Sequence, residues 1–203
     1  MDTIDLLTIQ AQGWKAMTVT TAKKMTFEEY LTYEDASDRR YEFNDGELVE
    51  MTPATVFHND LMMFFTFFLQ SEINHSNHPY CVRVNSTQIF NGKRTRRPDV
   101  LVMTTAQSKS LGNQPDILHE PCLLVIEIVS PTCRSVDTVE KRKEYAQFGI
   151  PEYWIVDFLV GTFSVLNLVN GSYIEKVYRE AELIASDIFP SISLSMNQVM
   201  ASI

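Results

Sequence analysis

Two carboxylates stand in or beside apolar segments of the sequence where charged side chains are rare. Asp99 directly precedes the apolar residues 100–103, and Glu127 lies inside the continuous apolar segment 122–129. A buried, ionised carboxylate needs a cation, a metal ion or a proton, because removing it from water is costly. If the two segments are neighbouring strands, Asp99 and Glu127 can converge at one end of a sheet. Two such oxygen ligands favour Mg²⁺ or Mn²⁺ over zinc.

Three further candidate functional side chains lie on the next predicted helix, residues 136–148. Asp137, Lys141 and Tyr145 are spaced at i, i+4 and i+8, which places them on one helix face. A lysine beside two carboxylates and a metal ion can orient a water molecule or hold a phosphate, as phosphodiester hydrolysis requires. The alternative is an exposed Asp137–Lys141 ion pair that adds little stability.

Other polar residues carry weaker signals. The basic cluster 93–97 is either a solvated loop or a phosphate contact. His58 lies near the start of a predicted helix without HxxxH or HExxH spacing, which favours a capping or surface residue over a metal ligand. We retain His58, Asp137 and Tyr145 as secondary site candidates. Glu42 lies in a predicted hairpin, where it fits a solvent-facing strand position.

The elements that must position these residues follow from hydrophobic periodicity and from turn residues. We expect a short helix capped by Thr26, with Glu29 at the capping-box spacing, and a longer helix over residues 56–74. The segment 123–157 reads as strand, helix and strand, which predicts two adjacent parallel strands. The remaining predictions are hairpins at 39–51 and 163–177, strands at 81–90, 100–103, 122–129 and 153–158, and a loop at 104–120.

Composition limits the class of protein. The chain has 203 residues, 45% of them hydrophobic, which is enough for one domain with a real core. A net charge of -9 opposes a non-specific nucleic-acid coat but leaves room for a local basic patch. The three cysteines, with no CxxC spacing, predict free thiols in a reducing cytoplasm. We expect no membrane span and no signal peptide, and we expect residues 1–24 to be an N-terminal extension that can be mobile, with Met17 as a second candidate start.

Several sequence blocks occur together in a fixed order over roughly residues 25–189. The blocks are Arg40-Tyr41-Glu42 with Asp45–Glu50, Arg97–Val100, Glu127–Pro131, Asp137 with Lys141 and Tyr145, and Gly149–Asp157. In this order they resemble the Uma2 (Uma-two) family of restriction-endonuclease-like proteins, within the PD-(D/E)xK nuclease superfamily.

The resemblance implies an α/β fold with a restriction-endonuclease-like core, in which a central mixed β-sheet is flanked by helices. It implies one nuclease-like domain over residues 25–203. Asp99 and Glu127 would be catalytic residues and metal ligands, and Glu42 would be a further acidic metal ligand. The superfamily places its lysine two residues after the glutamate, where this chain has Val129. By the same resemblance Lys141 of the next helix replaces it.

The expected activity is therefore that of a Mg²⁺- or Mn²⁺-dependent DNA endonuclease, with Asp99, Glu127 and Lys141 as its catalytic residues. One alternative is a nuclease fold without catalysis that binds nucleic acid or protein, which Val129 and the acidic net charge favour. Another alternative is a different metal-dependent phosphohydrolase. The resemblance also implies a homodimer, with which the phenylalanine-rich helix 56–74 is compatible.

Overall fold

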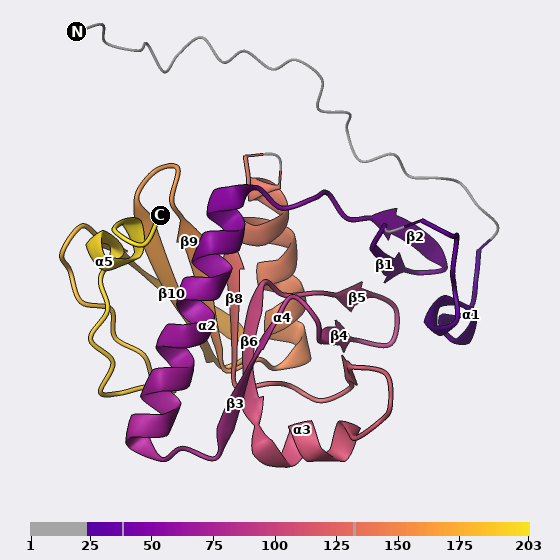
Figure 1. Ribbon diagram of the computed structural model, residues 1–203, viewed down its shortest axis with the longest axis horizontal. Helices are drawn as coiled ribbons and strands as arrows, with labels where there is room; N and C mark the ends of the chain where they lie inside the picture. The colour runs from indigo at the N-terminus through magenta and orange to yellow at the C-terminus, as the bar shows by residue number, and fades with distance from the viewer. Residues whose placement is uncertain (1–23, 38, 132) are drawn as a thin grey trace, which may run out of the picture. The chain divides into compact units, whose positions relative to one another are not determined.

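The computed structural model describes residues 24–37, 39–131 and 133–203 (Figure 1). The chain divides into two compact units, Met1–Thr52 and Pro53–Ile203. Apart from Lys24, the expected N-terminal extension and the candidate start at Met17 lie outside the described residues. That residues 25–203 form one domain stays a prediction.

The described part of the first unit contains a short helix and a hairpin, both as predicted. Helix α1 (Phe27–Leu31) begins at Thr26, whose side chain forms a reciprocal capping box with Glu29. Strands β1 (Tyr41–Asn44) and β2 (Glu47–Glu50) pair antiparallel. They turn at Asp45 and Gly46, whose φ angles of 48° and 88° require residues that tolerate the left-handed region.

The second unit is built on a six-stranded sheet in the order β11-β10-β9-β8-β6-β3. Its strands are β3 (Tyr80–Val84), β6 (Val100–Thr104), β8 (Leu124–Ile128), β9 (Glu152–Asp157), β10 (Thr162–Val169) and β11 (Ser172–Arg179). Strands β8 and β9 run parallel, whereas β6 pairs antiparallel with β8. The predicted mixed sheet, the central position of β8 and the parallel strand pair are confirmed.

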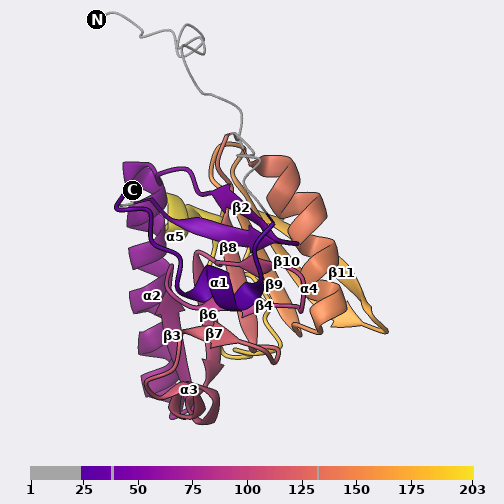
Figure 2. The same ribbon diagram turned by 90° about the vertical axis from the view of Figure 1, so that its right-hand side faces the viewer.

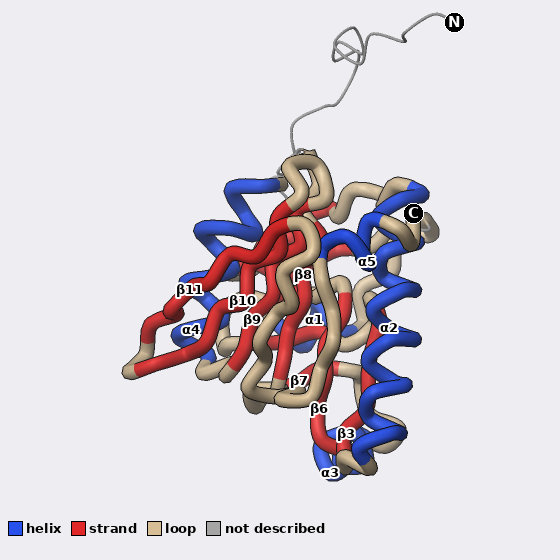
Figure 3. Tube along the Cα trace, turned by 90° about the vertical axis from the view of Figure 1, so that its left-hand side faces the viewer, coloured by secondary structure: helices blue, strands red, loops and turns tan. Residues whose placement is uncertain are grey.

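Helices pack on both faces of this sheet. Helix α2 (Val56–Ser76) covers one face, and a π-helical segment η1 (Val136–Lys141) that continues into α4 (Arg142–Phe148) covers the other (Figures 2 and 3). Alternation along the strands divides the core accordingly. Ile126 and its even-numbered neighbours pack in one apolar cluster with α2, and Val125 packs in a second cluster with Tyr145 of α4. A short helix α5 (Met196–Met200) contributes to the α2 side.

Two predictions about the connecting segments are wrong. The expected strand at 81–90 is broken at Asn85, which adopts a left-handed φ of 43°. Its second half, β4 (Gln88–Phe90), belongs to a small separate sheet with β5 (Thr95–Arg96) and β7 (Ile117–Leu118). The expected loop at 104–120 contains that strand β7 and a helix, α3 (Thr105–Leu111), which a Thr104–Gln107 capping box initiates.

Candidate functional site

The register of β6 and β8 brings the two predicted carboxylates to one end of the sheet. Val100 lies opposite Ile126 in this antiparallel pair, so continuing the register by one residue places Asp99 opposite Glu127. The Asp99 carboxylate is held there by the backbone of the neighbouring strand, because the amide of Ile128 donates a 2.7 Å hydrogen bond to Oδ2. The convergence that the sequence predicts is present.

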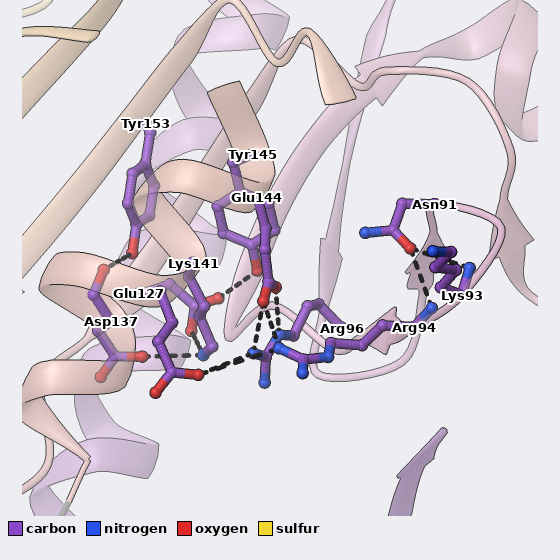
Figure 4. A network of polar contacts seen from close by, with 11 residues as sticks. Asn91, Lys93, Arg94, Arg96, Glu127, Asp137, Lys141, Glu144, Tyr145 and Tyr153 are labelled. Atoms are coloured by element: carbon purple, nitrogen blue, oxygen red, sulfur yellow. Dashed lines mark hydrogen bonds and ion pairs between the residues drawn. The ribbon is translucent and has the colours of Figure 1, made fainter. Parts of the chain in front are cut away.

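Glu127 is buried and both of its carboxylate oxygens accept hydrogen bonds from the helix that follows its strand. The Tyr145 hydroxyl donates to Oε1 at 2.6 Å, and Lys141 Nζ lies 2.7 Å from Oε2. Lys141 also lies 2.9 Å from Asp137 Oδ1 (Figure 4). The side chains of Lys141 and Asp137 are 12% and 5% exposed, so the interpretation of this pair as a surface ion pair is wrong.

The helical turn that carries Asp137 and Lys141 is π-helical. The segment Val136–Lys141 is wound more widely than an α-helix, and such turns often occur at functional sites. One carbonyl of the turn, that of Asp137, accepts a 2.9 Å hydrogen bond from the Tyr153 hydroxyl of β9. Val139 of the same turn is exposed. The predicted convergence of the i, i+4 and i+8 side chains is therefore present, although no feature of the sequence predicted a π-helical turn.

His58 joins the cluster from the opposite helix. Its Nε2 atom lies 2.9 Å from Asp99 Oδ1, and the two side chains are 13% and 16% exposed. The helix is capped by Thr55, whose hydroxyl oxygen accepts from the backbone amide of His58, so His58 is not itself the capping residue. The expectation of a surface side chain is wrong, because the ring reaches the sheet end that carries Asp99.

The electrostatics of the cluster favour an added positive charge. Burial raises the pKa of Glu127 to about 8; Lys141 opposes this rise, and the charges of Asp99 and Asp137 add to it. Burial also raises the pKa of Asp137, again against the effect of Lys141. The raised pKa values mean that the ionised forms of Glu127 and Asp137 lack enough positive charge nearby, and a bound cation would supply it.

The donor set suits a hard divalent cation better than zinc. Within residues 24–37, 39–131 and 133–203, no three His, Cys, Asp or Glu side chains are grouped so that they could hold a metal ion. Mg²⁺ needs fewer protein ligands, because it keeps several water molecules in its coordination shell and is commonly bound by one or two carboxylates. Asp99 and Glu127 supply two carboxylates, and each oxygen retains a lone pair beyond the hydrogen bond that it already accepts.

The basic cluster 93–97 is not a solvated loop. Arg96 forms a bidentate pair with Glu144 of α4, with Nε–Oε2 and Nη2–Oε1 distances of 2.7 and 3.0 Å. Arg94 also pairs with Glu144, and Figure 4 shows this connection between the β4–β5 hairpin and the helix that carries Lys141. Arg97 donates to the Ser86 carbonyl. The cluster therefore ties α4 in place, a role that its sequence did not indicate.

Two further predicted positions can be placed. Val129, where the superfamily's lysine would stand, is buried in the apolar cluster on the α4 side of the sheet. Glu42 belongs to β1 of the first unit and is 8% exposed, which contradicts the interpretation of a solvent-facing strand residue. Its role as a metal ligand stays a prediction.

Comparison with known proteins identifies the family to which the chain belongs. The model of the Uma2 family, described as "Putative restriction endonuclease", matches residues 27–197. The chain belongs to the Uma2 family. Membership confirms the resemblance inferred from the sequence blocks and supports a function of the nuclease type.

One sequence relative and one solved structure match most of this Uma2 protein. An uncharacterized protein of Synechocystis sp. is 27% identical over 142 residues, which are 70% of this chain and 79% of the relative. A crystal structure from Anabaena variabilis, described as a "putative nuclease", matches with a TM-score of 0.72 at 16% identity and covers 88% of this chain and 98% of its own. This second match shows that the fold is shared. Among the described helices, none is long and apolar enough to cross a membrane.

Proposed function

We propose that this protein is a Mg²⁺- or Mn²⁺-dependent DNA endonuclease that hydrolyses phosphodiester bonds. The observation that carries the proposal is the contact of Lys141 Nζ with Glu127 Oε2, at 2.7 Å, beside Asp99. Lys141, the last residue of η1, supplies the cation that Val129 cannot provide. Carboxylates and a lysine at one end of a sheet are suited to hydrolysis of a phosphodiester, whose transition state carries extra negative charge.

The residues then take distinct roles. Asp99 and Glu127 would hold the metal ion. When bound, the ion would supply charge stabilisation and lower the pKa of a coordinated water. The surrounding carboxylates favour the protonated form of Lys141, so it positions water or phosphate and does not act as the base.

Asp137 and Tyr145 orient Lys141 and Glu127, respectively. Asp137 holds Lys141 Nζ at 2.9 Å, and the Tyr145 hydroxyl fixes the second oxygen of Glu127 at 2.6 Å. Residues that fix a metal ligand in this way commonly change metal affinity by about 10–100-fold when they are removed.

We also infer that the protein acts as a homodimer in a reducing cytoplasm. Helix α2 supports the first inference, since Met63 and Phe67 on its outer side are 48% and 67% exposed and offer an apolar surface. The free thiols of Cys81, Cys122 and Cys133 fit the second. Size-exclusion chromatography with light scattering, comparing wild type with Phe67→Glu, tests the dimer.

The activity is tested with purified protein, linear and supercoiled duplex DNA, and Mg²⁺ or Mn²⁺. We expect cleavage that EDTA abolishes and that Asp99→Ala and Glu127→Ala both lose. Asp60→Ala removes an exposed carboxylate from α2 and should cleave as wild type does. Hydrolysis of bis(4-nitrophenyl) phosphate without DNA cleavage would favour a different phosphohydrolase. DNA binding without hydrolysis of either substrate would favour an inactive binding module.

A further inference from the structure

His58 approaches the carboxylate centre from an element that none of the other site residues share. Glu127 lies on β8, and Asp137, Lys141 and Tyr145 lie on the helical segment that follows it. His58 instead lies in the first turn of α2, on the other face of the sheet, where Thr55 caps the helix. Its ring extends to the sheet end, and Nε2 lies 2.9 Å from Asp99 Oδ1.

Asp99 is consequently held at both oxygens. The Ile128 amide donates to Oδ2 at 2.7 Å, and His58 Nε2 contacts Oδ1. The Ile128 amide alone would leave the carboxylate free to rotate about its last torsion, because that torsion is broad for aspartate. The second contact removes this freedom, and the low exposure of both side chains limits competition by water.

We propose that His58 is a positioning residue that orients the Asp99 carboxylate for metal binding. The inference rests on the proposed function and adds a residue to it. An N–H group at Nε2 of the imidazole is a sufficient hydrogen-bond donor for this contact. Ligand carboxylates are commonly held by hydrogen bonds of this kind, and losing one weakens metal binding by about 10–100-fold.

Two variants and one control separate positioning from other roles. His58→Ala removes the donor, whereas His58→Gln keeps an N–H group at a similar reach. His75→Ala is the matched control, because His75 lies near the other end of the same helix, is exposed and contacts the Ser71 carbonyl. Circular dichroism and thermal melting establish that each variant folds.

The first measurement needs no metal. A double-mutant cycle of His58→Ala and Asp99→Ala on the urea midpoint of the metal-free protein should show coupling between the two residues. Additive effects would overturn the proposed contact. The second measurement is Mn²⁺ affinity by calorimetry. We expect about a tenfold or greater weakening for His58→Ala, recovery in His58→Gln, and no change in His75→Ala.

Three outcomes would overturn the proposal in different ways. Unchanged Mn²⁺ affinity in His58→Ala would show that Asp99 needs no orienting partner. A nitrogen bound directly to Mn²⁺, detected by pulsed electron paramagnetic resonance in wild type and absent in His58→Ala, would make His58 a ligand instead. A wild-type protein that binds neither Mn²⁺ nor Mg²⁺ would refute the proposed metal centre itself, whatever the coupling cycle shows.

Discussion

Replacing Lys141 with methionine separates its catalytic role from its role in stability. Methionine keeps an unbranched chain and removes the charge that contacts Glu127 and Asp137 at 2.7 and 2.9 Å. Lys143→Met is the matched control, because Lys143 lies two residues further along the same helical segment and is exposed. The chain has 17 basic and 26 acidic residues, so either variant carries 16 and 26, a net charge of -10.

The expected loss of stability follows from the burial of the partners. Removing one member of a buried ion pair costs about 3–5 kcal/mol, because the remaining charge is left without compensation. The raised pKa of Glu127 lets that carboxylate take up a proton, so we expect the lower end, about 3 kcal/mol. For a chain of this size that is a fall in Tm of about 6–12 °C. Lys143→Met should stay within about 0.5 kcal/mol of wild type.

The Lys141→Met substitution should lower the rate of DNA cleavage without weakening metal binding. Lys141 competes with a metal ion for Glu127 Oε2, so Mn²⁺ affinity in Lys141→Met should be equal to or tighter than that of wild type. Cleavage should fall by about 10²–10³-fold, the effect of losing one preorganised group that stabilises transition-state charge. The assays are calorimetric Mn²⁺ titration and single-turnover cleavage of duplex DNA.

Either of two results would refute this reasoning. Unchanged cleavage by Lys141→Met, in a preparation whose wild type cleaves, would remove Lys141 from the chemistry. Loss of Mn²⁺ binding together with activity would show that the lysine supports the structure of the site and has no separate role in hydrolysis.

Three further predictions follow from the hydrogen bonds. Tyr145→Phe should cost about 1.5–3 kcal/mol and weaken Mn²⁺ binding, because it removes the donor on Glu127 Oε1; an unchanged melting temperature and affinity would contradict this. Glu152→Ala should cost about 2–4 kcal/mol in urea unfolding without changing Mn²⁺ affinity, because it leaves the side chains and amides that it binds, including the buried Trp154 indole, without an acceptor. Glu144→Gln should cost about 1–2 kcal/mol at pH 7. Although burial tends to raise the pKa of Glu144, its arginine partners lower the pKa below the usual value of 4.5. This stabilisation is therefore present above pH 4.5 and lost as the pH falls through the folded-state pKa, so the difference between variant and wild type should shrink in acid melts and a constant difference would contradict it.

The sequence was sufficient for the parts of the site that depend on local patterns. The continuous apolar segment around Glu127 predicted a central strand, and Gly149, with a φ of 90°, ends the following helix where a stop was expected. The spacing of Asp137, Lys141 and Tyr145 placed them on one face. Once strand and helix are adjacent, those side chains have Glu127 as their neighbour, so this half of the site could be predicted.

The other half depends on tertiary contacts that leave no local pattern. His58 meets Asp99 from a helix that is about 40 residues earlier in the chain, and no ligand spacing marks it. The pairing of Arg94 and Arg96 with Glu144 joins segments about 50 residues apart. A cluster of like charges in a sequence usually indicates a solvent-exposed segment. In this protein Glu144 of α4 pairs with two arginines of the cluster.

The central claim is that Asp99 and Glu127 bind one divalent cation at the end of the sheet. A crystal structure of the protein soaked with Mn²⁺, with anomalous diffraction data, tests this most directly. We predict a single strong anomalous peak at about 2.0–2.2 Å from a carboxylate oxygen of each residue, with Lys141 Nζ nearby. A peak bound by other residues, or no peak in protein that cleaves DNA in the presence of Mn²⁺, would contradict the account.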